Sequence, residues 1–464
     1  MLNIEADRVA GLSTSEAKVL KDLLDIYQAH YVPNMQKIRY YEGKVSLGEV
    51  NLGIALPQGM RGLEIGCSWG AKTVDVLAAR SMFDGFVGAA GEEVEELDRI
   101  VQGNRLIAEY MKACRDELKF GCTFATLSAD PQLGCKIRFH SPMTAAARWD
   151  GEKGRIAYGF AIVDTAPDNR SNLNWSPSVV NLYLDNAVTV LTRSGTNWAV
   201  TERHANKMNR PLMEPLIWSA TTAKPFGRSR IKEPIRRLIQ GYVRTLANAT
   251  IGLEFSTAPQ KYLLGITDDQ YDAVISDKFR QYVGSIIAST SNPETGEKPS
   301  FGQLPQGTIT PHTEMLRDLA AQFSAATSLP VSEVGVVNDA NPTSSDAILA
   351  QSTTLVSLAE QLNTGNGDAL RTIALMALAI ANNTTLESLS DEQRNVIAHF
   401  KNPAMPSVAV TADAAIKIAT VRPGFAGTDT FLEMIGFSQA DIRRVRAQEE
   451  LQRGLDTLAE LDLA

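Results

Sequence analysis

The sequence lacks the patterns that mark metal sites, secreted proteins and membrane proteins. It has four cysteines in 464 residues, Cys67, Cys114, Cys122 and Cys135, and no pair of them has the two-residue spacing of a zinc knuckle. We therefore expect buried free thiols and a reducing compartment. No run of about eighteen apolar residues predicts a membrane span. Residues 1–30 are acidic and amphipathic, which is not the pattern of a signal peptide.

Further absences narrow the function classes. The chain has no phosphate-binding loop ending in Lys-Ser or Lys-Thr, so we do not expect an ATPase. Its 45 Lys and Arg against 53 Asp and Glu give a net charge of −8, which argues against a protein that wraps DNA with a basic surface. His140 and His204 have no second ligand at a useful spacing. No catalytic residue, cofactor or metal is predicted.

The residues that are present predict a folded α+β protein. Hydrophobic residues make up 44% and charged residues 21%, and the length exceeds one typical core. Amphipathic periodicity predicts helices over 13–30, where Ser13 and Glu16 form a capping box, and over 92–119. From Gly121 to Val200 a period of two predicts short strands of an antiparallel sheet, at 122–127, 136–139, 156–163, 179–184, 187–191 and 197–201.

Two long helices are predicted to bracket a small module in the middle of the chain. The first follows Pro225 and carries Pro234 in its first turn, where the missing N–H costs nothing. The second spans Thr310–Ser328, with Thr310 as N-cap and Pro311 as the first helical residue. Residues 256–309 between them combine short strands with one helix. The pattern indicates a two-helix stalk with a module at its far end.

A polar loop and further helices are predicted to follow the stalk. Residues 331–344 are rich in turn formers and contain no Lys or Arg. Helices are expected over 346–362 and, as a separate buried helix, over 368–381. A strand-like run at 408–411 leads into a helix that ends at Val421, and a charged helix runs from Gln439 to the C-terminus.

The opening of the first stalk helix is strongly basic. Its only acidic residue is Glu233, and its cations are Arg228, Arg230, Lys232, Arg236, Arg237 and Arg244. Two interpretations remain open at this point: a solvated polar face, or a surface that contacts phosphate or a partner.

Residues 63–70 offer an alternative function. The sequence Leu63–Gly70 (LEIGCSWG) resembles the glycine-rich turn of an S-adenosylmethionine-dependent methyltransferase, and Asp84 lies near the position of a ribose-binding acid. However, Ser68 replaces the middle glycine, and the bulky Trp69 stands where the backbone must approach the ligand. The following residues also do not alternate between strands and helices. A helix from about Trp69 to Met82 explains this segment without a cofactor.

The order of the features resembles that of one family, the portal proteins of tailed double-stranded DNA bacteriophages of the long-tailed type. Four matches carry the resemblance. First, 226–231 (FGRSRI) opens a long helix, and second, a small module lies between two long helices. Third, Leu329–Pro330 is followed by a loop and then by 341–348 (NPTSSDAI), which enters a helix, and fourth, 408–417 (VAVTADAAIK) precedes 432–438 (LEMIGFS). Together they cover roughly residues 15–450.

The resemblance implies a portal fold with a mostly helical core and an antiparallel sheet in a wing domain. The implied domains are the wing at 1–224 and 346–438, stem helices at 225–255 and 310–330, a small α/β clip at 256–309, a tunnel loop at 331–345, and a short helical crown at 439–464. Within the second part of the wing, 346–363 is the implied channel helix.

The resemblance also implies a structural role without enzyme activity or cofactor. A homo-oligomeric ring of 12 subunits is expected at a unique vertex of the virion capsid, after assembly in the host bacterial cytoplasm. The ring gives double-stranded DNA a channel for packaging and ejection. The implied partners are the terminase large subunit, a head–tail connector or adaptor protein, the major capsid protein and a scaffolding protein, with no membrane.

Three groups of site residues follow from the resemblance. The tunnel loop contributes Val337, Asn338, Asp339, Asn341, Thr343 and Ser344, and the clip docking surface contributes Ser276, Lys278, Arg280, Glu294 and Lys298. The stem cations named above form the third group. A polar loop without cations touches DNA without binding it tightly, because each neutralised phosphate adds affinity. Arg236, Arg237 and Arg244 are expected in intersubunit pairs, because an uncompensated ring of like charge repels itself.

Overall fold

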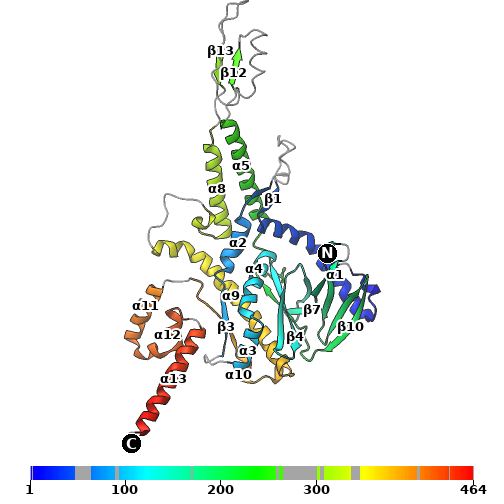
Figure 1. The fold of residues 1–464 in the computed structure, drawn as a ribbon, viewed down its shortest axis with the longest axis vertical. Coiled ribbons are helices and arrows are strands. Elements are labelled where there is room, and N and C mark those ends of the chain that lie inside the picture. The colour runs from blue at the N-terminus through cyan, green and yellow to red at the C-terminus, as the bar shows by residue number, and fades with distance from the viewer. Residues whose placement is uncertain are drawn as a thin grey trace, which may run out of the picture.

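We describe the protein from a computed structural model. The structure describes residues 2, 4–46, 64–88, 94–168, 171–257, 261–264, 300–303, 308–335, 345–404, 408–437 and 439–462. These residues form helices and antiparallel sheets, which agrees with the predicted α+β class. Figure 1 shows a body from which a two-helix stem rises, with three helices, α11 to α13, to one side of the body.

Four helices form the N-terminal half of the body. They are α1 (Thr14–Tyr41), α2 (Trp69–Ala78), α3 (Glu95–Gly103) and α4 (Leu106–Phe120). The predicted capping box at the start of α1 is confirmed, since the Ser13 hydroxyl accepts from the Glu16 N–H and the Glu16 carboxylate accepts from the Ser13 N–H. The helical region predicted over 92–119 is also confirmed, and it forms the two helices α3 and α4.

Two larger antiparallel sheets cover the region where six strands were predicted. The five-stranded sheet has the order β10-β9-β8-β7-β6 and the three-stranded sheet the order β11-β4-β5. Their strands are β4 (Cys122–Asp130), β5 (Gly134–His140), β6 (Ala145–Asp150), β7 (Arg155–Asp168), β8 (Ser171–Tyr183), β9 (Ala187–Ser194), β10 (Asn197–Ala205) and β11 (Met213–Ile217).

All six predicted strands are present, and β6 and β11 were missed. β6 opens with Ala145-Ala146-Ala147, and alanine has a low β-propensity. β11 contains Pro215, which is tolerated because β11 lies at the edge of its sheet. The described residues also form three short ribbons: β1 (Lys44–Ser46) pairs with β2 (Glu64–Gly66), β3 (Phe83–Val87) with β14 (Ile397–Phe400), and β12 (Lys261–Leu264) with β13 (Ser300–Gln303).

The body has two hydrophobic cores. The smaller one lies between the start of α1 and the five-stranded sheet, where Leu20, Leu23 and Phe160 are fully buried. The larger one joins α2, α4, the three-stranded sheet and the base of the stem. All four cysteines are buried and free, as predicted. None of the helices among the described residues has the length and hydropathy needed to cross a bilayer.

The stem consists of α5 (Glu233–Thr257) and α8 (Thr310–Thr327), which lie side by side and carry the β12–β13 ribbon at their far end (Figure 1). Both predicted stalk helices are therefore confirmed. Pro234 lies in the first turn of α5 as predicted. The N-cap of α8 is Ile309 rather than Thr310, one residue earlier than predicted.

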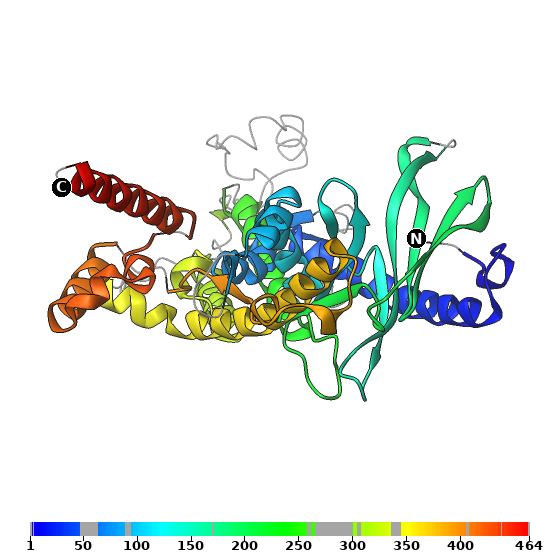
Figure 2. The ribbon, with the colours of Figure 1, turned by 90° about the horizontal axis from the view of Figure 1, so that it is seen from below.

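The largest difference from prediction is α9 (Ser345–Ala381), a single helix of 37 residues. The sequence suggested two helices separated around Gly365–Gly367. The helix continues because Asn366 is fully buried there and its amide donates to Glu117 and Tyr110 of α4. In Figure 2, α9 runs from the C-terminal helices to the sheets of the body.

The C-terminal part comprises η5 (Leu386–Ser388), α10 (Asp391–Arg394), α11 (Val408–Val421), η6 (Pro423–Gly427), α12 (Asp429–Met434) and α13 (Gln439–Asp462). The strand-like run at 408–411 was predicted wrongly, because it forms the first turn of α11. The charged terminal helix is confirmed as α13. Its Arg443 pairs with Asp98 of α3 at 2.5 Å, which attaches α13 to the body.

Candidate functional site: the stem and its base

An aromatic cluster fixes the stem to the body. Trp69, the first residue of α2, is 4% exposed and stacks on Phe323 of α8 at 4.4 Å between ring centroids. The same indole contacts Tyr242 of α5 at 4.2 Å. One tryptophan from the body thus packs against both stem helices. This role explains the bulky residue in the segment that resembled a methyltransferase turn.

Gly70 of that segment serves close packing. A Cβ on Gly70 would lie 2.0 Å from the carbonyl oxygen of Tyr40, so α2 approaches the end of α1 more closely than any side chain allows. β2, which ends at Gly66, pairs antiparallel with β1. In a dinucleotide-type turn the strand belongs to a parallel sheet covered by helices. The local structure therefore disagrees with the methyltransferase alternative.

Two alanine variants separate these interpretations. Gly70→Ala is expected to lower the free energy of unfolding by about 1–3 kcal/mol, because the new methyl group overlaps backbone that cannot move alone. Gly66→Ala is the matched control, because its Cβ would have no atom within 4 Å, and we expect a change below about 1 kcal/mol. Chemical denaturation measures both. A loss of S-adenosylmethionine binding in Gly66→Ala, measured by calorimetry, would instead support the methyltransferase.

Arg230 departs from the sequence-based expectation. It is 7% exposed, and its guanidinium donates to the Thr73 carbonyl of α2 at 2.6 Å and the Thr327 carbonyl of α8 at 2.7 Å. Burial lowers the pKa of Arg230 to about 10. The grouping of Arg230 with a phosphate- or partner-binding surface is therefore wrong. Arg230 joins the lower end of α8 to α2.

Two other stem cations already have partners within the chain. Arg236 and Arg237 both pair with Glu233, at 2.6 Å and 2.9 Å, and Arg236 also donates to Gln36 of α1. A single carboxylate thus pairs with two guanidinium groups one helical turn away, as (i, i+3) and (i, i+4) neighbours, and the three side chains keep a net charge of +1. The expected intersubunit pairing of these two arginines stays a prediction.

The remaining stem cations are Arg228, Lys232 and Arg244. Arg228 and Lys232 are exposed and Arg244 is half-buried. Among the residues that the structure describes, none of the three has an ion-pair partner. They are the stem cations that stay available to a partner.

The other two predicted groups lie outside the described residues. These are the tunnel-loop residues Val337, Asn338, Asp339, Asn341, Thr343 and Ser344, and the clip residues Ser276, Lys278, Arg280, Glu294 and Lys298. Their assignment stays a prediction.

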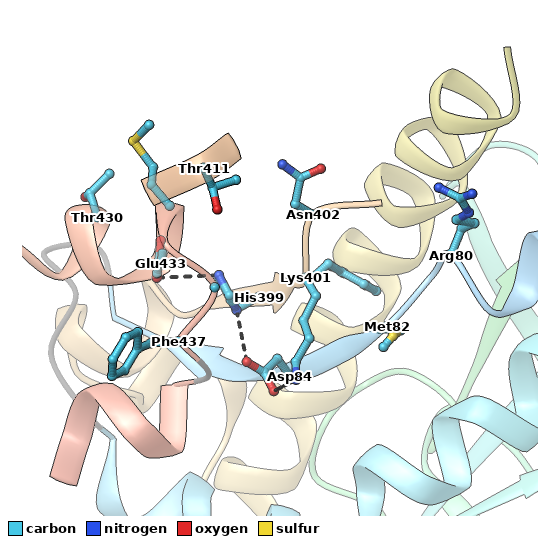
Figure 3. Close-up of a pocket in the computed structure, with 13 residues that line it drawn as sticks. Arg80, Met82, Asp84, His399, Lys401, Asn402, Thr411, Thr430, Glu433 and Phe437 are labelled. Atoms are coloured by element: carbon cyan, nitrogen blue, oxygen red, sulfur yellow. Dashed lines mark ion pairs between the residues drawn. The ribbon is translucent and has the colours of Figure 1, made fainter. Parts of the chain in front are cut away.

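A pocket of about 530 Å³ lies where α11 and α12 meet the β3–β14 ribbon (Figure 3). His399 is central, with Nδ1 3.9 Å from Asp84 Oδ2 and Nε2 3.5 Å from Glu433 Oε1. Lys401 Nζ lies 3.7 Å from Asp84 Oδ1. Asp84, the acid of the methyltransferase alternative, is thus paired with side chains more than 300 positions away in the sequence, which no local pattern reveals. The contact between Glu433 and His399 links α12 to the ribbon.

The histidines noted in the sequence are packed or paired with neighbours. His140 is buried and its Nε2 lies 3.0 Å from the Thr126 hydroxyl, and burial lowers its pKa to about 4. His204 pairs with Glu202 on the surface at 2.9 Å. Within the described part of the chain, no group of three His, Cys, Asp or Glu side chains is arranged to hold a metal.

Comparison with known proteins gives weak structural likenesses. No family model and no curated protein matches the chain. A chain in the structure titled "Virion of native gene transfer agent (GTA) particle" is similar with a TM-score of 0.44 and 12% identity, over 77% of this chain and 86% of that one. A chain in "Neck of empty GTA particle computed with C6 symmetry" gives 0.45 and 14%, over 78% and 87%. A chain in "Neck of native GTA particle computed with C12 symmetry" gives 0.44 and 13%, over 80% and 89%. Likenesses of this size do not assign the chain to a family.

Proposed function

We propose that this chain is a structural protein of a phage-like head–tail vertex, and that its copies form a portal ring around a channel for double-stranded DNA. The observation that carries the proposal is the stem. Helix α5 leaves the body, α5 and α8 support a small two-stranded module, and α8 returns to the body ahead of a 37-residue helix, α9. This is the order of stem, clip, tunnel loop and channel helix that the portal resemblance implies.

The construction of the stem base supports a mechanical role. Trp69 of α2 contacts both stem helices, and Arg230 joins the end of α8 to α2. A force on the stem is therefore transmitted to α2. A conduit for DNA needs such rigid attachment, whereas an enzyme needs a site with aligned reactive groups. We propose no catalytic role for this chain.

Charge and composition support a channel that does not bind its cargo. Each cation placed against the duplex adds affinity by releasing counterions, and this affinity would slow movement of the DNA. The net charge of −8 and the absence of Lys and Arg from 331–344 limit such contacts. We propose that residues 337–344 line the narrowest part of the channel.

Exposed apolar side chains support assembly with further copies or partners. On α11, Ile418 and Val421 are 39% and 82% exposed, and on α13, Leu451 and Leu455 are 66% and 52% exposed. Each pair lies one helical turn apart, so each forms a short apolar stripe. We propose that assembly into the vertex covers these stripes. The proposed external partners are the terminase and later the connector proteins, both at the clip.

Electron microscopy of the purified full-length chain tests the proposal. Averaged top views should show a closed ring of about 12 copies with a central hole wide enough for a duplex. A chain that stays monomeric at micromolar concentration, by native mass spectrometry, would rule out the portal assignment. Assemblies without a central hole would favour a scaffold or adaptor.

Deleting residues 337–342 tests the proposed channel loop. We expect rings to form as in the wild type, because the deletion removes no stem or body residue, while retention of packaged DNA falls several-fold. Ring assembly is scored by electron microscopy and retention by nuclease protection of packaged particles. If the deletion abolishes rings, the loop is a subunit contact and not a channel lining.

A further inference from the structure

The outer face of α8 carries an acidic stripe that local packing does not explain. Glu314, Asp318, Ala321 and Ala325 are exposed and follow the spacing i, i+4, i+7, i+11, which places them on one face of the helix. The opposite face holds the buried residues, such as Phe323. Within the described part of the chain, neither carboxylate has an ion-pair or hydrogen-bond partner.

The outer face of α5 carries the complementary charge. Arg237 and Arg244 lie seven residues apart, two turns along one face. Arg237 shares the Glu233 carboxylate with Arg236, whereas Arg244 has no ion-pair partner among the described residues. Arg244 of α5 therefore has counterparts of opposite charge in Glu314 and Asp318 of α8, where Arg317 is a third exposed charged residue beside them.

The opposite charges lie at the same height along the stem. Gly241 of α5 is level with Leu319 of α8, because a Cβ on Gly241 would lie 3.3 Å from the Leu319 side chain. With a rise of 1.5 Å per residue, Arg244 lies about 4.5 Å farther from the body than Gly241. Because α8 runs in the opposite direction, Asp318 and Glu314 lie about 1.5 Å and 7.5 Å farther out than Leu319. The guanidinium is thus level with the gap between the two carboxylates.

We propose that Arg244 of one copy forms ion pairs with Glu314 and Asp318 of the neighbouring copy, so that α5 of each stem packs on α8 of the next. This inference rests on the proposed ring. Rotation about an axis along the stem moves one copy onto the next without changing heights, so residues that are level in one copy stay level across the interface. Ala321 and Ala325 let the neighbouring helix approach closely.

Charge reversal in the full-length chain tests the pairing. Arg244→Glu places like charges together and should raise the concentration for half-assembly of rings about tenfold, measured by mass photometry. Adding Glu314→Arg and Asp318→Arg should restore assembly to within about threefold of the wild type. Raising the salt concentration should weaken wild-type rings but strengthen Arg244→Glu rings, because screening acts on attraction and repulsion alike.

The controls distinguish this inference from the proposed function. Lys21→Glu reverses an exposed charge near the start of α1, which lies away from the stem (Figure 1), and should leave assembly unchanged. If the wild type forms rings and Arg244→Glu forms them equally well, or if the compensating substitutions fail to restore assembly, the pairing is wrong while the ring stands. Unchanged assembly with altered DNA retention would place Arg244 in the channel. A wild type that forms no ring overturns both proposals.

Discussion

Replacing Arg230 with methionine is expected to lower the free energy of unfolding by about 3–5 kcal/mol. The substitution removes two hydrogen bonds from a charged donor, each worth about 1.5–3 kcal/mol, and leaves the Thr327 carbonyl at the end of α8 without its cap. Methionine retains an unbranched apolar chain, so the loss reports mainly on the guanidinium. Chemical denaturation followed by circular dichroism measures the change.

Arg228→Met is the matched control for this prediction. Arg228 lies two residues earlier and is exposed, so its substitution should change the free energy of unfolding by less than about 0.5 kcal/mol. Equal effects of the two substitutions would show that Arg230 contributes through net charge, and that its attachment of α8 to α2 is unimportant.

Glu117→Gln is expected to stabilise the protein by about 2–4 kcal/mol above pH 8. Glu117 is fully buried between α4 and α9, and its Oε2 accepts from the Asn366 amide at 2.8 Å. Burial raises the pKa of Glu117 to about 8. Ionising a carboxyl in this setting costs more than ionising it in the unfolded chain. Glutamine is uncharged at every pH, so the variant avoids that cost.

The surrounding polar network favours an uncharged side chain at position 117. Glu117 Oε1 and Asn366 Oδ1 are both buried acceptors without a hydrogen-bond donor among the described residues. The other members, Tyr110 and Ser81, bond to each other at 2.7 Å, and the Tyr110 hydroxyl also accepts from Asn366. A protonated carboxyl or a glutamine amide adds a donor to a network that has an excess of acceptors.

The sign of the pH dependence follows from the two pKa values. The folded chain keeps the Glu117 proton up to about pH 8, whereas the unfolded chain releases it near 4.5. Between these values the folded state binds more protons, so this residue lowers stability as the pH rises through the window. Thermal melts from pH 4 to 9 should show this decline, and Glu117→Gln should show less of it. Glu95→Gln, on the exposed surface of α3, should keep the wild-type profile.

The sequence predicted the features that depend on local chemistry. The start of α1 follows from the Ser13–Glu16 capping box, and the start of the stem helices from Pro234 and Pro311. The six strands with alternating polarity were found because a half-buried sheet imposes that alternation. These signals lie within a few residues of the structure they determine.

The missed features depend on partners far away in the sequence. Gly365 and Gly367 disfavour a helix locally, yet α9 continues because Asn366 bonds to Glu117, 249 positions earlier. Arg230 is indistinguishable by sequence from the other stem cations, and its burial depends on carbonyls supplied by α2 and α8. The relation of Glu314 and Asp318 to Arg244 depends on how α5 and α8 pack side by side, and local sequence does not determine this packing.

The aromatic cluster at Trp69 also makes the stem a lever. From Tyr242, where the cluster contacts α5, the helix extends about 22 Å to its far end, so a rotation of about 5° at the cluster displaces that end by about 2 Å. Trp69 contacts both stem helices, so the stem pivots at this residue. A partner that pushes on the β12–β13 ribbon therefore applies torque to α2, which carries Trp69. Because α2 also contacts α9, a partner that binds the β12–β13 ribbon can displace α9 through the stem and α2.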